Sequence, residues 1–292
     1  MFNTEHKPEI GEAKMLMDGL EVVTAPNASP MTFTGTQSYI LGDSEVAVID
    51  PGPNDPAHLA ALNRAIGGRR VSHVLVTHSH LDHSPLAKAF DAPVLAFGPS
   101  GTGVSEVMKT LGEHSGGEGI DLDFVPDQIL VDGDTVSGAG WAIEAVHTPG
   151  HMSNHLCFAF EGGLFSGDHV MAWSTTLVSP PDGDLTQFMA SLEKLRARDE
   201  ARYFPGHGPV LDNPHEMLAH QIAHRLAREA QILAALPGQI TAITAMVYKD
   251  LDNRLLPMAA RNVFSHLIDL YQRGKVHCNG PIRFDGRFEL AD

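Results

Sequence analysis

The chain has 292 residues, of which 43% are hydrophobic and 19% are charged, and its formal net charge is −16. This composition is typical of a globular protein with one large domain or two unequal ones, and the acidic balance disfavours general attraction to nucleic acid. No apolar run approaches the roughly 18 residues of a membrane span, and the N-terminus lacks the basic and apolar regions of a signal peptide, so we expect a cytoplasmic protein without membrane contacts.

The N-terminal half alternates predicted strands with short helices. A helix is predicted over residues 55–66, with Asp55 as its N-cap, Pro56 in its first turn and Gly67 after its end. A second, shorter helix is predicted over residues 86–90. Strands are expected at residues 19–24, 38–41, 46–50, 71–76 and 93–97.

Residues 98–119 contain seven glycines and few apolar side chains. They lack the Gly-Lys-Ser/Thr ending of a phosphate-binding loop, so we interpret them as a mobile flap or an exposed loop. Beyond them, strands are predicted at 128–131, 141–146, 156–160, 164–166 and 203–204, and a helix at 185–197. This alternation favours a layered α/β sandwich.

A long helix is predicted after Asn213 and Pro214, with Leu218, Ile222, Leu226 and Leu233 on one face. Pro237 and Gly238 end it, and we place a domain boundary there, giving domains 1–236 and 237–292. The last 56 residues carry seven Lys/Arg and six Asp/Glu, so they are nearly neutral, unlike the acidic remainder. Two predicted helices, 240–251 and 257–273, and a ribbon over 276–278 and 282–290 suggest a small winged-helix-like module.

The sequence VSHVLVTHSHLDH, residues 71–83, joins a buried strand to a cluster of metal-binding side chains. In an extended segment the side chains of His78 and His80 point the same way and could hold one ion, while Asp82 and His83 follow at a turn and could face a second. The alternative is a solvated loop, which we disfavour because packing does not explain three histidines and an aspartate in six residues. The spacing fits two ions better than one.

Three further segments place His or Asp next to glycine after a predicted strand. They are Thr148-Pro149-Gly150-His151, Gly167-Asp168-His169 and Gly206-His207. Together with the histidine cluster, this ordered set of motifs resembles the metallo-β-lactamase-fold hydrolase superfamily over residues 31–236. Within it, the segments FSGDHV and FPGHGP and the helical tail look most like the β-lactamase-like endoribonuclease subfamily, and glyoxalase II shares most of the ligands.

The resemblance implies a four-layer αββα sandwich of the α/β class and a dinuclear metal centre. His78, His80 and His151 would hold the first metal, and Asp82, His83 and His207 the second, with Asp168 bridging them. Imidazole and carboxylate ligands suit two Zn²⁺ ions, although iron or manganese would also fit. A hydroxide shared by the metals would attack a carbonyl or phosphoryl centre, and Asp82 and Asp168 would be the catalytic carboxylates.

Other histidines lie near these positions. We expect His155 and His169 to support the metal ligands or donate protons, rather than to be merely structural; for His147 the two interpretations stay open. His73 is expected to be structural, and the helical histidines His215, His220 and His224 to be solvated.

The substrate is expected to be a single-stranded RNA-like phosphodiester or a small thioester or lactone. A mono-iron persulfide dioxygenase, a weak β-lactamase and a nucleic-acid-binding module with a vestigial metal pocket are the alternatives. His80 stands where flavodiiron proteins carry glutamate, which disfavours an oxygen-reducing diiron enzyme. Asp168 stands where secreted β-lactamases carry Cys or Ser, which disfavours antibiotic hydrolysis as the main activity.

The tail offers basic and aromatic residues that could bind nucleic acid: Arg254, Arg261, Arg273, Lys275, Arg283 and Arg287, with Phe284 and Phe288 for stacking. We prefer the alternative that Val263, Leu267 and Leu270 dock the tail on the body or on a second copy of the chain, because nucleic-acid modules are usually clearly basic.

Overall fold

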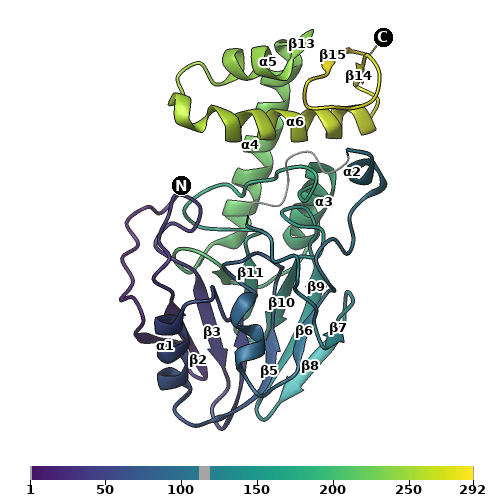
Figure 1. Cartoon of the computed structure of the whole chain (residues 1–292). Coiled ribbons are helices and arrows are strands. Elements are labelled where there is room, and N and C mark those ends of the chain that lie inside the picture. The colour runs from purple at the N-terminus through teal and green to yellow at the C-terminus, as the bar shows by residue number, and fades with distance from the viewer. Residues whose placement is uncertain (1, 112–118, 292) are drawn as a thin grey trace.

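The fold is that of a computed structural model, which describes residues 2–111 and 119–291. It has two packed β-sheets flanked by helices, and a small module at the C-terminus (Figure 1).

The first sheet has seven strands in the order β1 to β7. The first four pair antiparallel and the rest parallel. They are β1 (Ala13–Met17), β2 (Leu20–Thr24), β3 (Gln37–Leu41), β4 (Glu45–Ile49), β5 (Arg70–Leu75), β6 (Val94–Ala96) and β7 (Gln128–Ile129). The second sheet has the order β12-β11-β10-β9-β8. Its strands are β8 (Thr135–Gly138), β9 (Trp141–His147), β10 (Leu156–Phe160), β11 (Gly163–Gly167) and β12 (Tyr203–Pro205).

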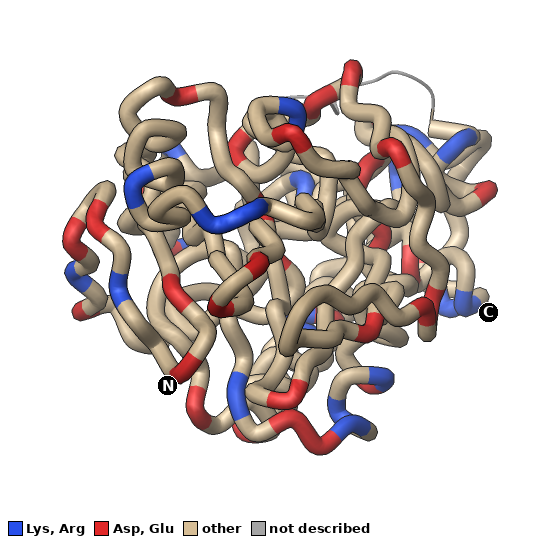
Figure 2. The backbone as a smooth tube through the Cα atoms, turned by 90° about the horizontal axis from the view of Figure 1, so that it is seen from below, with Lys and Arg blue, Asp and Glu red and all other residues tan. Residues whose placement is uncertain are grey.

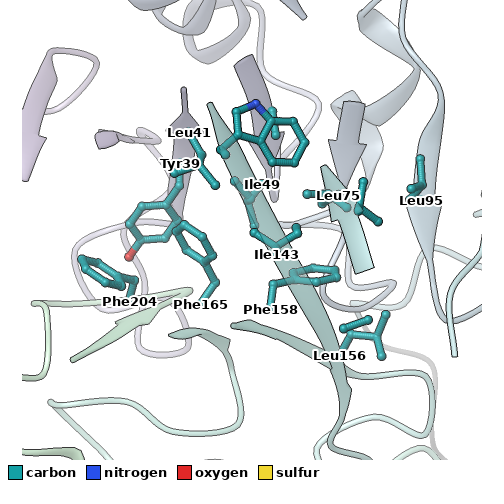
Figure 3. Packing of buried hydrophobic residues seen from close by; sticks show 14 of the residues in the cluster. Tyr39, Leu41, Ile49, Leu75, Leu95, Ile143, Leu156, Phe158, Phe165 and Phe204 are labelled. Atoms are coloured by element: carbon teal, nitrogen blue, oxygen red, sulfur yellow. The ribbon is translucent and has the colours of Figure 1, made fainter. Parts of the chain in front are cut away.

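The main hydrophobic core lies between the two sheets. Figure 3 shows Tyr39 and Ile49 of the first sheet facing Ile143, Phe158 and Phe165 of the second. Alternate residues of each strand point into this layer because successive side chains of a strand lie on opposite faces.

Helices cover the outer faces of both sheets. Helix α1 (Pro56–Ile66) packs on the first sheet and begins as predicted, with the Asp55 side chain accepting a hydrogen bond from the backbone N–H of His58 at 2.8 Å. Helices α3 (Leu185–Arg196) and α4 (Pro214–Ala234) pack on the second sheet. The predicted four-layer αββα sandwich is confirmed.

Several predicted elements need correction. Residues 85–89 form a 3₁₀ helix, η1 (Pro85–Ala89), and β1, β8 and the short β13 (Gly238–Gln239) were not predicted. Leu226 is 52% exposed, so it does not belong to the buried face of α4. Within the glycine-rich segment 98–119, α2 (Glu106–Thr110) forms and buries Met108, whereas residues 112–118 lie outside the described residues.

The C-terminal module contains α5 (Ile240–Val247), η2 (Asn253–Leu255) and α6 (Leu256–Gln272), with β14 (Val276–Cys278) and β15 (Arg287–Leu290) forming a three-stranded sheet with β13. Figure 1 shows it on the C-terminal part of α4, beside α2 and α3. Val263, Leu267 and Leu270 are fully buried in its core, which also receives Met108 and Ile232 from outside the module. Phe288 is fully buried too, so it is not available to stack on bases, the possibility that the sequence left open. The boundary at residue 236 stays a prediction.

In the described part of the chain, no helix combines the length and the apolar composition that crossing a bilayer requires.

Candidate metal centre

The side chains predicted to bind metal are delivered by strand ends at one edge of the sandwich. β5 runs into the loop carrying His78 to His83, and β9, β11 and β12 end just before His151, Asp168 and His207. β11 pairs parallel with β12, and β9 and β11 both run antiparallel to β10. These three strands therefore end at the same edge, which brings residues distant in sequence together.

The first group consists of His78, His80, His151 and Asp168, whose ligand atoms lie within 4.8 Å of one another. The Nδ1 atom of His80 lies 2.9 Å from Nε2 of His78 and 3.1 Å from Nε2 of His151. Three ring nitrogens thus converge on one point.

The second group consists of Asp82, His83 and His207. Nε2 of His207 lies 3.1 Å from Oδ2 of Asp82 and 3.3 Å from Nε2 of His83. This group therefore offers two imidazole nitrogens and one carboxylate oxygen to a common centre.

Asp168 reaches both groups. Its Oδ2 atom lies 3.6 Å from Nε2 of His151 and 3.3 Å from Nε2 of His207, and its Oδ1 atom lies 3.6 Å from Nε2 of His83. Gly206 permits this approach, because a Cβ atom there would lie 2.5 Å from Oδ1 of Asp168. All seven side chains predicted as ligands are thus brought together at one place.

The remaining ring nitrogens of four histidines are held by hydrogen bonds. His151 Nδ1 donates to the carbonyl of Leu177 at 2.8 Å, and His207 Nδ1 to that of Gly35 at 3.3 Å. His83 Nδ1 donates to Oδ2 of Asp50 at 2.9 Å. The hydroxyl of Thr77 donates to the same carboxylate at 2.7 Å and accepts from His78 Nδ1 at 2.9 Å.

These bonds direct the lone pair of each opposite nitrogen at the centre, the arrangement that metal-binding histidines adopt. Sequence reasoning missed Asp50 and Thr77. The available signal was their position beside the histidine loop: Asp50 directly follows β4, and Thr77 lies two residues after the end of β5, which pairs parallel with β4.

The two groups differ in electrostatics. Burial, reinforced by the neighbouring histidines, lowers the pKa of His80 to about 3 and that of His78 well below its usual value. In the second group burial also acts to lower the pKa, but Asp82, Asp168 and Asp50 outweigh it and raise the pKa of His83 to about 9. Asp168 and Asp82 likewise raise the pKa of His207. The carboxylates thus favour positive charge at this centre.

A divalent cation fits this arrangement. The buried Oδ1 atom of Asp168 has no hydrogen-bond partner among the described residues, and buried polar atoms are normally satisfied. Imidazole nitrogens facing one another, with a carboxylate between the groups, are the donors that zinc and similar ions take.

The neighbouring histidines have separate surroundings. The backbone N–H of Asp168 donates to His155 Nε2 at 3.2 Å, and His155 Nδ1 donates to the hydroxyl of Thr148 at 2.9 Å. The His169 ring is buried 4.5 Å from the ring of Phe188, and neither of its nitrogens has a hydrogen-bond partner among the described residues. His147 stacks on Phe97 with ring centres 3.8 Å apart. The predicted roles of His155 and His169 stay predictions.

Apolar side chains lie on segments next to the proposed ligands. Leu81, between His80 and Asp82, is 49% exposed, and Leu122 on the adjoining segment is 75% exposed. On another side, Phe33 and Trp173 stack with ring centres 4.9 Å apart beside Gly208. The adjacent stretches 31–36, 79–84 and 171–176 contain no Lys or Arg.

Comparison with known families assigns both parts of the chain. Residues 31–207 match the metallo-beta-lactamase superfamily, and residues 240–281 match the beta-lactamase associated winged helix domain. The predicted winged-helix character of the tail is therefore confirmed.

Curated relatives cover much of the chain. It is 34% identical to the "Beta-lactamase-like protein 2 homolog" of Drosophila melanogaster, over 86% of this chain and 87% of that protein. It is 33% identical to the "Atrochrysone carboxyl ACP thioesterase" of Aspergillus fumigatus, over 78% of this chain and 68% of that protein.

Solved structures share the fold. A metallo-beta-lactamase family protein from Thermus thermophilus superposes with a TM-score of 0.75 at 22% identity, covering 94% of this chain and all of that one. A beta-lactamase domain protein from Burkholderia ambifaria gives a TM-score of 0.79 at 21% identity, covering 98% and 96%.

Proposed function

We propose that this chain, which belongs to the metallo-beta-lactamase superfamily and is a hydrolase, uses two metal ions to hydrolyse a small thioester with an apolar acyl group. The observation that carries the dinuclear proposal is the reach of the Asp168 carboxylate to histidines of both groups. A carboxylate placed between the two groups can be shared by two ions held about 3.5–4 Å apart.

His78, His80 and His151 would hold the first ion and Asp82, His83 and His207 the second, with Asp168 shared. Zinc suits this set of nitrogen and carboxylate donors, and iron or manganese would also fit. When bound, the ions would supply a water whose pKa lies near neutrality and would polarise the group under attack.

The chain's own carboxylates divide the remaining work. The Asp82 side chain is 26% exposed, whereas that of Asp168 is 9% exposed. We therefore assign to Asp82 the orientation of the attacking water, since its side chain is the more accessible of the two carboxylates. Thr36 donates to Oδ2 of Asp82 at 3.5 Å and helps to fix this carboxylate.

The apolar side chains on segments next to the proposed ligands support a thioester over a phosphodiester. Leu81, Leu122 and the Phe33–Trp173 pair offer contacts for an acyl group, and the adjacent stretches lack cations for a phosphate backbone. The Aspergillus fumigatus relative is named as a thioesterase, which supports the same choice.

The experiment is a substrate comparison on purified protein whose metal content has been measured. The probes are an S-acyl N-acetylcysteamine with an apolar acyl chain, S-lactoylglutathione, a lactone, single-stranded RNA and a β-lactam. We expect thiol release from the apolar thioester to have the highest kcat/KM. Cleavage of RNA without thiol release would contradict the substrate, and full thiol release by protein that holds one metal ion per chain would contradict the dinuclear centre.

Asp168→Ala tests the shared carboxylate. The variant should lose at least one metal ion per chain and fall in thioester turnover by at least about a hundredfold, because both groups lose a ligand. Metal analysis and thiol-release assays measure the two effects. Unchanged metal content with unchanged turnover would refute the bridging role.

A further inference from the structure

Arg225 is a buried arginine at the junction between the catalytic sandwich and the C-terminal module. It lies on α4 and is 2% exposed. Burial lowers the pKa of Arg225 to about 10, so the guanidinium is still charged at neutral pH. Among the described residues no carboxylate forms an ion pair with it, which is unusual because buried charges are normally paired.

The guanidinium instead joins three segments. Its Nη2 atom donates to the carbonyl of Thr176, in the loop between β11 and α3. Its Nη1 atom donates to Oδ1 of Asn262 on α6 at 3.4 Å. Its carbon lies 5.2 Å from the centre of the Phe188 ring on α3.

The segment held by Arg225 in turn contacts two of the proposed metal ligands. The Thr176 hydroxyl donates to the backbone carbonyl of Asp168 at 2.7 Å. The next residue, Leu177, supplies the carbonyl that accepts from His151 Nδ1 at 2.8 Å. One fixed dipeptide thus sets both the backbone of Asp168 and the ring orientation of His151.

Phe188 provides a second connection. A Cβ atom at Gly150 would lie 2.3 Å from Cα of Phe188, so the residue before His151 packs directly against the backbone of Phe188. The guanidinium therefore rests on the same residue that supports the His151 loop.

We propose that Arg225 is a positioning residue for the metal centre, holding Thr176 and Leu177 so that His151 and Asp168 point at the ions. The inference rests on the proposed function, because it takes these two residues as ligands. Partners of metal ligands are worth about 10- to 100-fold in metal affinity, and Arg225 acts one step further out. We therefore expect an effect near the lower end of that range.

The test compares Arg225→Met, Arg225→Lys and the control Arg228→Met in the full chain. Arg228 lies on the same helix, 4.1 Å from the centre of the Tyr248 ring, and contacts the carbonyl of Val247 rather than the metal-site loop. Zinc affinity is measured by competition with a chromophoric chelator, and the absorption spectrum of the cobalt-loaded protein reports on ligand geometry.

We expect Arg225→Met to bind zinc about tenfold more weakly and to shift the cobalt spectrum. Arg225→Lys should recover part of the affinity, since it keeps one donor, and Arg228→Met should stay within twofold of the original chain. Equal zinc affinity and equal cobalt spectra for the two methionine variants would overturn the proposal.

If Arg225→Met does not fold, Thr176→Val decides, because it removes only the hydroxyl that donates to the backbone carbonyls of Asp168 and His169. Unchanged zinc affinity in that variant would overturn the proposal. If the unsubstituted chain binds no zinc, iron or manganese, the metal centre itself is wrong, and that outcome is distinct from a failure of Arg225 alone.

Discussion

Asp50 orients histidines of both metal groups with one carboxylate. Its Oδ2 atom accepts from His83 Nδ1 and from the Thr77 hydroxyl, which in turn accepts from His78. Its Oδ1 atom accepts from the backbone N–H of Thr77 at 2.7 Å. A carboxylate in this position fixes the ring and makes the opposite nitrogen a better donor to a metal.

Asp50→Asn should therefore weaken metal binding without removing a ligand. The amide keeps the size of the side chain but takes away the negative charge that supports His83, so we expect about 10- to 100-fold lower affinity for the more weakly held ion. Chelator competition measures this, with the exposed Asp91→Asn as the matched control. An affinity equal to that of the control would contradict the role of Asp50.

At the scale of single elements, α1 is docked on the first sheet through a buried histidine. His58 is fully buried and its Nε2 atom lies 2.8 Å from the Ser38 hydroxyl of β3. Burial lowers the pKa of His58 from 6.5 to about 4, against the opposing effect of Asp55. The folded protein thus prefers the neutral ring.

The stability of the protein should consequently depend on His58 between pH 6.5 and 4. As the pH falls through this range, His58 binds a proton in the unfolded chain but not in the folded chain, so stability is lost. From pH 7 to pH 4 the original chain should lose on the order of 3 kcal/mol of unfolding free energy relative to the His58→Leu variant. Urea unfolding at several pH values measures it. A pH-independent difference would contradict this.

The elements that the sequence predicts well carry strong local signals. Asp55, Pro56 and Gly67 bound α1 as expected, because capping and the left-handed φ of 63° at Gly67 are local requirements. β1 was missed because three of its five residues are exposed and none of them is β-branched or aromatic. Leu226 was predicted on the buried face of α4 but is exposed. Helical spacing shows which residues share a face, and it does not show how far along the helix that face stays covered by its neighbours.

The residues of the metal site likewise fall into those that a sequence pattern predicts and those that it does not. Its seven proposed ligands lie in short motifs at strand ends, three of them directly after a glycine, so a sequence pattern could predict them. No local motif identifies Asp50 or Arg225. Asp50 acts through a hydrogen bond with a residue 27 positions away, which strand register sets, and Arg225 through one with a residue 49 positions away, which helix packing sets.

Over the whole molecule, charges of opposite sign are interspersed. On the face in Figure 2, Lys and Arg lie among Asp and Glu rather than gathered in one area. Of the six basic tail residues considered for phosphate binding, five form ion pairs with carboxylates: Arg254, Arg273, Lys275, Arg283 and Arg287. The sixth, Arg261, donates to the Ser179 hydroxyl at 3.1 Å.

We therefore expect weak binding of single-stranded RNA. At physiological salt the dissociation constant should exceed about 10⁻⁴ M, the weak end of non-specific binding, because few cations are free to displace counterions. Fluorescence anisotropy with a labelled oligonucleotide measures it. Micromolar binding that weakens steeply with salt and is lost in an Arg254→Ala/Arg283→Ala/Arg287→Ala variant would contradict this.

Anomalous diffraction from crystals grown with zinc tests the dinuclear centre most directly. We expect two peaks per chain, about 3.5–4 Å apart, one among His78, His80 and His151 and the other among Asp82, His83 and His207, with Asp168 touching both. A single peak, or none at saturating zinc, would contradict it.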